Sequence, residues 1–424
     1  MREANSDEAI RHKIMSIFNS LGSNYSLDSI LQALFASNSE ENKTILASFL
    51  EEKYGGKAIL FYKGREAIRF ALRLIDKKEA VVGICGFTCY AVYDAVVKEG
   101  YQSVFFDIDE QSLHFSKATL EAAKKKNPQL QIVIIQNTLG YPCDMEAIAK
   151  YCKKEKIILI EDLAHSIGTT YENGKEAGTV GDFVALSFSQ DKVIDGVSGG
   201  ALIIRNNKFS ILNFTFSMVA TKQQVIDKLY PLFTFLIRKT YGFGLGKFLH
   251  RILKLFHLLS QPMMDLDGLH ELPGWYCFLV YSEFLLLESS LSHRRKIASI
   301  YKDMLGLSLR AKRSNPSEIA TLSSIARDDN IIELSTNLRF PIFVEKREEL
   351  IAFLKQQSIF VSDIWYDAPI APKKYLSKTS YRHECPNGEK VSERILNLPT
   401  HRNVSEEDAK FIADKVNEWI GKGN

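Results

Sequence analysis

Short, almost uniformly apolar runs alternate with amphipathic stretches between residues 58 and 206 of this 424-residue chain. The runs lie at residues 80–84, 103–106, 131–135, 156–160, 183–188 and 201–204. Helical patterns separate several of them, for example at 65–75 and 144–155. Strands that lack polar alternation are buried on both faces, and their alternation with helices is typical of a mostly parallel sheet. The sequence therefore predicts an α/β domain.

The rest of the chain predicts three further regions around this domain. Residues 1–50 show helical periodicity, for example at Ile14, Ile17 and Phe18, and predict an N-terminal helical arm. The large α/β domain then occupies 51–207, an apolar and basic helical insert 208–274, and a smaller α+β domain 275–424.

The C-terminal region contains three elements with clear local signals. The pattern predicts one helix over 276–305, a strand over 339–344 and a terminal helix over 405–419. Ser405 and Asp408 have the spacing of a capping box, which favours a helix start at that point.

Composition excludes several classes of protein. Hydrophobic residues make up 46% and charged residues 25%, as in soluble globular proteins, and a net charge of +3 is too small to indicate nucleic-acid binding. The six cysteines are scattered without zinc-like spacing, which predicts a reduced, cytoplasmic protein without a metal site. The polar N-terminus is no signal peptide, and no uncharged apolar run reaches the roughly 18 residues of a membrane span.

Lys192 and Asp162 are the strongest candidates for chemistry. Asp162 follows the run 156–160, and Lys192 follows the run 183–188. The carboxyl ends of parallel strands meet at one edge of a sheet, where ligands bind, so the two side chains can converge. A lysine for a Schiff base and an acid for the pyridinium nitrogen are what pyridoxal phosphate (PLP) requires. Taken singly, the lysine fits a solvated surface and the aspartate fits a helix cap.

A phosphate site is expected where Gly64 opens an amphipathic helix. Free backbone N–H groups at a helix start attract an anion, and the Ser187 hydroxyl could reach the same anion. The alternatives are a helix that merely begins after a glycine and a sheet serine bonded to backbone.

Taken in order, several elements resemble the DegT/DnrJ/EryC1/StrS family of PLP-dependent sugar aminotransferases of fold type I. They are Asn-Thr-Leu-Gly-Tyr-Pro-Cys-Asp-Met at 137–145, Glu-Asp-Leu-Ala-His at 161–165, Gly-Asp at 181–182, Ser-Phe at 187–188 with Lys192, the glycine pair 199–200 and Leu-Pro-Thr-His at 398–401. The resemblance implies a mostly parallel seven-stranded sheet with a smaller C-terminal α+β domain, and a homodimer.

The resemblance also implies roles for individual residues. Lys192 would be the Schiff-base lysine, Asp162 would hold the ring nitrogen, and His165 would lie by the phenolic oxygen of PLP. The expected cofactor-binding set is Gly64, Arg65, Glu66, Phe87, Tyr90, Asn137, Asp162, His165, Ser187 and Lys192.

Two departures from the family pattern concern the same site. Where an aromatic residue often stacks on the pyridine ring, Phe87-Thr88 is followed by Cys89, so Phe87 or Tyr90 would stack, or Cys89 would pack there. The family's Asn-x-Arg element has no counterpart in 265–275. Three arginines could substitute for it: Arg238, Arg251 and Arg339.

The implied reaction is transfer of an amino group from glutamate to a nucleotide-linked keto-sugar, in the biosynthesis of a surface polysaccharide or lipopolysaccharide. One alternative is a PLP-dependent sugar dehydratase, although related dehydratases often lack the lysine. Another is a PLP-binding, membrane-associated scaffold or regulator with little turnover.

The insert has two interpretations. A helical pair that packs on the protein or builds the dimer is favoured over peripheral membrane contact through residues 230–257. The second interpretation rests on basic and apolar side chains that would meet anionic lipid together.

Overall fold

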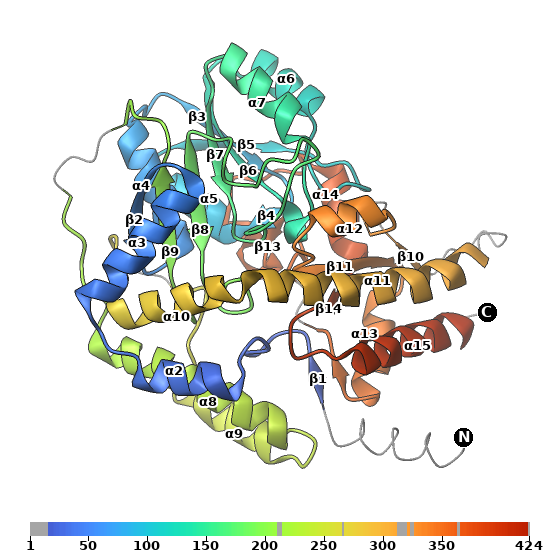
Figure 1. Ribbon diagram of the computed structural model, residues 1–424. Helices are drawn as coiled ribbons and strands as arrows, with labels where there is room; N and C mark the ends of the chain where they lie inside the picture. The colour runs from blue at the N-terminus through green and yellow to red at the C-terminus, as the bar shows by residue number, and fades with distance from the viewer. Residues whose placement is uncertain are drawn as a thin grey trace.

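A seven-stranded sheet forms the centre of the large domain (Figure 1). The computed structural model describes residues 16–209, 214–264, 267–311, 320–322, 326–362 and 365–422. The strand order is β2-β9-β8-β7-β6-β3-β5, and β9 is antiparallel to both of its neighbours while the other adjacent pairs are parallel. The strands are β2 (Lys57–Phe61), β3 (Val81–Cys85), β5 (Gln102–Phe106), β6 (Leu130–Gln136), β7 (Ile158–Asp162), β8 (Phe183–Ser187) and β9 (Gly200–Ile204). This confirms the predicted fold class.

Apolar cores on both faces explain why the strands lack polar alternation. Along β6, Ile132 and Ile134 join one core, whereas Val133 and Ile135 join the other, because successive side chains point to opposite faces. Helices cover these faces: α3 (Glu40–Tyr54), α4 (Gly64–Ile75), α5 (Tyr90–Lys98), α6 (Lys117–Lys126) and α7 (Met145–Lys154).

The N-terminal arm is helical only in part. It contains α2 (Leu27–Phe35) and α3, but Ile17 and Phe18 form the short strand β1 (Ile17–Phe18) instead of the predicted helix. This strand pairs in parallel with β12 (Ile359–Phe360), so its backbone groups are satisfied by a segment that local periodicity cannot reveal. The periodic position Ile14 lies outside the described residues.

The small domain has its own core around an antiparallel sheet. Its elements are β10 (Ala320–Leu322), β11 (Arg339–Val344), β14 (Ile395–Pro399), α11 (Leu287–Ala311), α12 (Asp329–Leu334), α13 (Arg347–Gln356), α14 (Pro386–Arg394) and α15 (Glu406–Lys422). The predicted capping box is present, because Ser405 Oγ accepts from Asp408 N–H (3.1 Å) and Asp408 accepts from Ser405 N–H (3.0 Å).

The single helix predicted over 276–305 is two helices, α10 (Gly274–Leu285) and α11. Trp275 and Val280 of α10 pack in the large domain, whereas Ile297 and Tyr301 of α11 pack in the small one. The chain leaves helical geometry between them at Leu286, and α11 begins in the large-domain core through Leu287 and Leu291 before it enters the small domain. The domains are also joined by a parallel pair, β4 (Thr88–Cys89) with β13 (Ile370–Ala371). Two 3-10 turns complete the described elements: η1 (Thr138–Gly140) and η2 (Lys373–Lys378).

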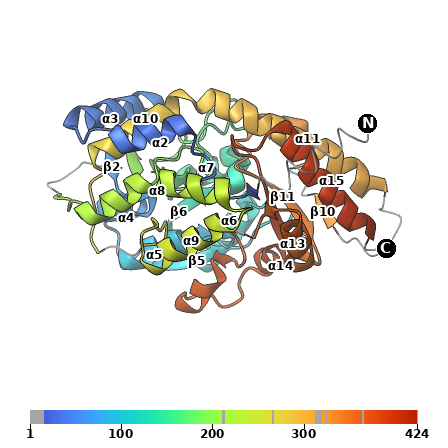
Figure 2. The ribbon, with the colours of Figure 1, turned by 90° about the horizontal axis from the view of Figure 1, so that it is seen from below.

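The insert forms two helices, α8 (Thr221–Thr240) and α9 (Leu245–Leu255), which face the viewer in Figure 2. Asp227 anchors α8, because its fully buried carboxylate accepts hydrogen bonds from the hydroxyls of Tyr62 and Tyr276 (2.6 Å each). Among the described residues, no helix is long and apolar enough to cross a membrane.

Candidate active site

One pocket opens at the edge of the sheet where β6, β7 and β8 end. Gln136, Asp162 and Ser187 are the last residues of these strands, so the sheet itself brings them together. The residues that line the pocket are Lys63, Gly64, Arg65, Ile68, Cys89, Ala91, Val92, Gln136, Asp162, Ala164, His165, Leu186, Ser187, Ser189, Lys192, Pro262, Met263 and Tyr366. Six of the ten expected cofactor-binding residues line the pocket: Gly64, Arg65, Asp162, His165, Ser187 and Lys192.

Asp162 is buried and sparsely bonded. Among the described residues, the one hydrogen bond to its carboxylate comes from the backbone N–H of Ala164 (2.9 Å). Burial raises the pKa of Asp162, and the charge of Lys192 acts in the opposite direction. A buried carboxylate of this kind is stabilised by a cationic partner in the pocket.

Lys192 lies on the loop after β8. Burial lowers its pKa, although Cys89 and Asp162 nearby act in the opposite direction. Its Nζ lies 4.5 Å from the centre of the ring of Trp365, a residue of the small domain. The lowered pKa favours the neutral form of the amine.

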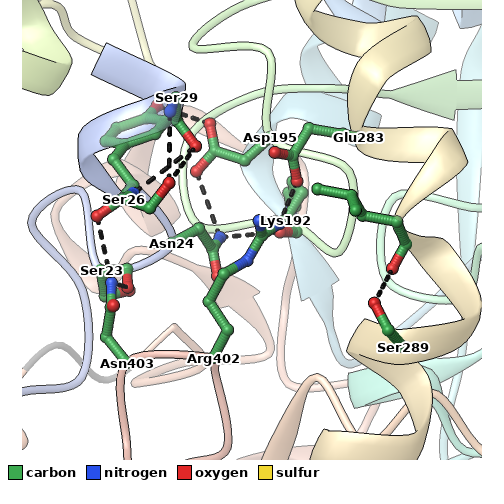
Figure 3. Close-up of polar contacts among 12 residues, drawn as sticks. Ser23, Asn24, Ser26, Ser29, Lys192, Asp195, Glu283, Ser289, Arg402 and Asn403 are labelled. Atoms are coloured by element: carbon green, nitrogen blue, oxygen red, sulfur yellow. Dashed lines mark hydrogen bonds and ion pairs between the residues drawn. The ribbon is translucent and has the colours of Figure 1, made fainter. Parts of the chain in front are cut away.

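The N-terminal arm holds the loop that carries Lys192. Asn24 donates to the carbonyl oxygen of Lys192 (3.0 Å) and to Asp195 (3.2 Å), and Figure 3 shows it between these two residues. Asp195 also accepts from the Tyr25 hydroxyl (2.5 Å) and from the backbone N–H of Asp191 (2.8 Å). Burial raises the pKa of Asp195 to about 6.

The imidazole of His165 is neutral, and a backbone N–H group orients it. Burial, aided by the charges of Lys192 and Arg339, holds its pKa well below the usual range. Its Nδ1 accepts from the backbone N–H of Leu139 (3.1 Å), which places the proton on Nε2. The ring also lies beside Trp365, with centroids 5.1 Å apart.

At the end of the pocket where the phosphate is expected, the start of α4 packs closely against neighbouring strands. A side chain at Gly64 would collide with Ser187, and one at Gly200 would collide with the backbone of Gly64. The glycines therefore let the N-terminus of α4 approach the ends of β8 and β9. Backbone N–H groups at such a helix start are suited to an anion.

Lys63, which the sequence analysis did not select, completes this end of the pocket. Its side chain is 2% exposed, and its Nζ has no hydrogen-bond partner among the described residues. The Nζ lies 4.6 Å from the centre of the Tyr62 ring. Burial lowers the pKa of Lys63 to about 8, while Asp227 acts to raise it. An orphaned buried ammonium beside a helix N-terminus is a site for an anion.

Arg65 and Glu66 are occupied by other contacts. The Arg65 guanidinium donates to the carbonyl oxygen of Pro262 (2.9 Å) and contacts Met263 Sδ (3.3 Å). Glu66 caps α4 by accepting from the backbone N–H of Lys63 (3.1 Å), and it does not line the pocket. The side chain of Arg65 thus fixes a wall of the pocket, whereas its backbone belongs to the helix start.

Neither aromatic candidate for ring stacking lines the pocket. Phe87 is fully buried against Tyr366, with ring centroids 4.8 Å apart, and Tyr90 stacks on Tyr375 at 4.7 Å. Neither belongs to the lining, whereas Cys89 does. Of the three alternatives for this position, the structure brings Cys89 into the pocket.

Asn137 and Glu161 organise the loops around the site. Asn137 donates to the Tyr171 hydroxyl (3.0 Å), which in turn donates to Glu161 (2.9 Å). Glu161 also accepts from the backbone N–H groups of Val180 (2.8 Å) and Gly181 (2.6 Å). The two adjacent acids of the strand thus point to opposite sides, one to a loop and one to the pocket.

Two residues from the small domain complete the set that sequence reasoning missed. Tyr366 accepts from the side-chain amide of Gln136 (3.1 Å) and lies 3.4 Å from His165 Nδ1. The Trp365 ring lies close to both Lys192 and Arg339, and the Arg339 Cζ is 4.8 Å from the ring centre. Of the three candidate arginines, Arg339 is therefore near the site. The others are Arg238, bonded to the Tyr25 carbonyl oxygen, and Arg251, exposed on α9.

The residues present fit PLP at both ends of the pocket. The Lys192 amine and the buried Asp162 carboxylate meet the needs of its aldehyde and ring nitrogen, and the ammonium of Lys63, which has no hydrogen-bond partner among the described residues, meets those of its phosphate beside Gly64 and Ser187. The fold and this donor set define a PLP-dependent transferase of fold type I.

The family model for DegT/DnrJ/EryC1/StrS aminotransferases matches residues 26–230 and 276–417, so the chain belongs to that family of PLP-dependent aminotransferases. It is 25% identical over 377 residues to a pleiotropic regulatory protein of Geobacillus stearothermophilus, covering 88% of this chain and 87% of the relative. It is 24% identical over 373 residues to the GDP-perosamine synthase of Escherichia coli O157:H7, covering 88% of each.

The fold also matches solved structures. An aminotransferase from Psychrobacter cryohalolentis superposes with a TM-score of 0.71 at 16% identity, covering 96% of this chain and 99% of the other. At this identity the match supports the fold alone.

Proposed function

We propose that this aminotransferase adds an amino group to a keto carbon of a nucleotide-linked sugar. The observation that carries the proposal is the placement of Lys192 and Asp162 in one pocket at the carboxyl edge of the sheet. The sugar class is supported by the GDP-perosamine synthase relative, whose name states a nucleotide-linked amino sugar.

The cofactor would be held at three points. Lys192 would bind its aldehyde carbon, Asp162 its ring nitrogen, and the start of α4 with Lys63 and Ser187 its phosphate. When bound, PLP supplies an electron sink for negative charge at the substrate carbon. Asp162 keeps that sink effective, because a buried carboxylate favours a protonated ring nitrogen.

Lys192 is the proton carrier of the proposed reaction. Its Nζ accepts a proton from the substrate carbon and returns it as a general acid, and its lowered pKa keeps the neutral amine available. The Trp365 ring lies beside this amine, with its centre 4.5 Å from Nζ. His165, with its proton on Nε2, offers a hydrogen bond to the phenolic oxygen of the cofactor.

Glutamate is the proposed donor, and a homodimer the proposed assembly, acting in the biosynthesis of a surface polysaccharide or lipopolysaccharide. These points rest on resemblance to the family, whose relatives cover most of the chain. We place the reaction in the cytoplasm because the cysteines are free thiols.

A single-turnover experiment tests the reaction. Adding glutamate to the PLP-loaded enzyme should convert the cofactor to its amine form, and a nucleotide-linked keto-sugar should then restore the aldehyde form and appear as an amino sugar. A product that lost a hydroxyl without gaining nitrogen would instead indicate a dehydratase. No spectral response to any amino donor would overturn the proposal in favour of a regulator.

A further inference from the structure

The helix α9 carries an unusually exposed apolar surface. Five large apolar side chains on or beside this helix are 61–72% exposed: Phe243, Leu245, Phe248, Leu255 and Phe256. In Figure 1 the helix lies at the lower edge of the molecule, beyond α8, and Figure 2, which is seen from below, shows it facing the viewer. The segment also lies largely outside the match to the family model, which is interrupted between residues 230 and 276. The surface is therefore a feature of this chain that the proposed reaction leaves unexplained.

The orientation of α9 is fixed by close packing. A side chain at Gly246 would collide with the backbone carbonyl of Ile237, and Leu253 is 5% exposed on the same side. Helical periodicity then places the remaining side chains in two neighbouring stripes. The outward apolar stripe consists of Leu245, Phe248 and Leu255. The stripe next to it consists of Lys247, Arg251 and Lys254, all exposed.

From Lys228 to Met264, the part of the insert that includes α9, every charged side chain is basic. Residues 228–264 contain six lysines and arginines and no aspartate or glutamate. None of Lys247, Arg251 and Lys254 forms an ion pair within the part of the chain that the structure describes. The partner that complements this surface is apolar and anionic at once.

A second copy of the chain meets only half of that requirement. A two-fold interface places the same patch on both subunits, so basic stripes would lie near basic stripes. Anionic lipids meet both requirements, because acyl chains accept the apolar stripe while headgroups neutralise the basic one.

We propose that α9 docks the enzyme on the surface of an anionic membrane. Phe248 and Leu255 enter the boundary between headgroups and acyl chains, and Lys247, Arg251 and Lys254 lie among the headgroups. The chain leaving α9 continues to Pro262 and Met263, which line the active-site pocket. One continuous segment therefore carries both the proposed membrane contact and part of the pocket wall.

Co-sedimentation of the full-length, PLP-loaded protein with vesicles tests this proposal without reference to activity. The protein should pellet with vesicles of phosphatidylcholine and phosphatidylglycerol, and less so at high salt, but not with phosphatidylcholine alone. Each basic side chain contributes about fivefold in affinity, so the triple variant Lys247→Gln, Arg251→Gln, Lys254→Gln should bind roughly 100-fold more weakly. Phe248→Ser with Leu255→Ser should weaken binding by more than about tenfold.

Leu285→Ser provides the matched control, because Leu285 is 65% exposed at the end of α10 and should leave pelleting unchanged. Three results would overturn the proposal. The wild-type protein could stay in the supernatant with anionic vesicles, or pellet equally with neutral ones. Alternatively, sedimentation velocity could show that Phe248→Ser with Leu255→Ser dissociates a dimer while vesicles bind neither protein, which would assign the surface to a second copy.

Discussion

Asn24 donates a hydrogen bond from its side-chain amide to the backbone carbonyl oxygen of Lys192, across 3.0 Å. The same amide reaches Asp195 (3.2 Å), and its oxygen accepts from the Arg294 guanidinium (3.2 Å). The N-terminal arm, the Lys192 loop and the small domain thus meet at one buried amide. The position of the proposed catalytic amine therefore depends on a residue outside the pocket.

Replacing Asn24 with alanine should loosen the Lys192 loop. The change leaves buried partners unsatisfied, which costs about 1–3 kcal/mol of unfolding free energy. It should also shift the pH dependence of the visible absorbance of bound PLP, a readout that a purely structural loss would leave unmoved. Urea unfolding and spectral titration measure both effects. Asn42→Ala, which removes an exposed hydrogen bond in the same arm, is the control and should change neither.

Asp162→Asn should reduce kcat by about 10²-fold or more, because the amide cannot stabilise a protonated ring nitrogen in the buried pocket. Cofactor affinity should also fall, because the charged contact to the ring nitrogen is one of the three proposed anchors, whereas the bond from the Ala164 N–H can be retained and preserve the local fold. Glu161→Gln is the matched control on the same strand. It weakens the contacts to residues 178–181 and should lower stability by about 1–3 kcal/mol while largely preserving kcat. Equal kcat in both variants would contradict the assigned role of Asp162.

Lys63→Met should weaken PLP binding about 10- to 150-fold, the equivalent of one lost charge-assisted contact to a phosphate. Equilibrium titration of the unloaded protein with PLP measures this change directly. Lys57→Met, at the exposed start of β2, should bind PLP like the wild-type protein. An unchanged affinity in Lys63→Met would mean that the phosphate lies elsewhere.

The buried ammonium of Lys63 also predicts a pH dependence of stability. Burial lowers its pKa from 10.5 to about 8, so between these values the unfolded chain binds more protons than the folded one. Its contribution therefore destabilises the unloaded protein below pH 8, by up to about 3 kcal/mol, and the penalty fades as the pH rises toward 10.5. Lys63→Met should be the more stable protein near neutrality and gain little near pH 10. A difference in urea stability that is independent of pH would contradict this account.

The sheet and the two central residues of the site could be predicted because their signals are local. A strand buried on both faces, such as β6, is apolar throughout, and Asp162 and Lys192 each follow such a strand. Parallel strands then bring their ends together without any further information.

Other parts depend on contacts that local patterns do not record. Ile17 and Phe18 fit a helix by spacing, but a strand more than 300 residues later pairs with them. The apolar pattern continues across Leu286, so it does not reveal that one helix ends there and a second begins, which then passes from the large-domain core into the small-domain core. By sequence Lys63 fits an exposed lysine, but in the fold it is only 2% exposed and its Nζ lies over the Tyr62 ring. Its one local signal is its place between an apolar strand and the glycine that starts a helix.

The most direct test of the account is to locate the lysine that binds the cofactor. Both Lys192 and Lys63 line the pocket, and burial lowers the pKa of each. Reducing the PLP-loaded protein with borohydride, digesting it and identifying the labelled peptide by mass spectrometry distinguishes the two. The account predicts a pyridoxyl label on Lys192 and its loss in Lys192→Ala. A label on Lys63, or no label on either lysine, would contradict it.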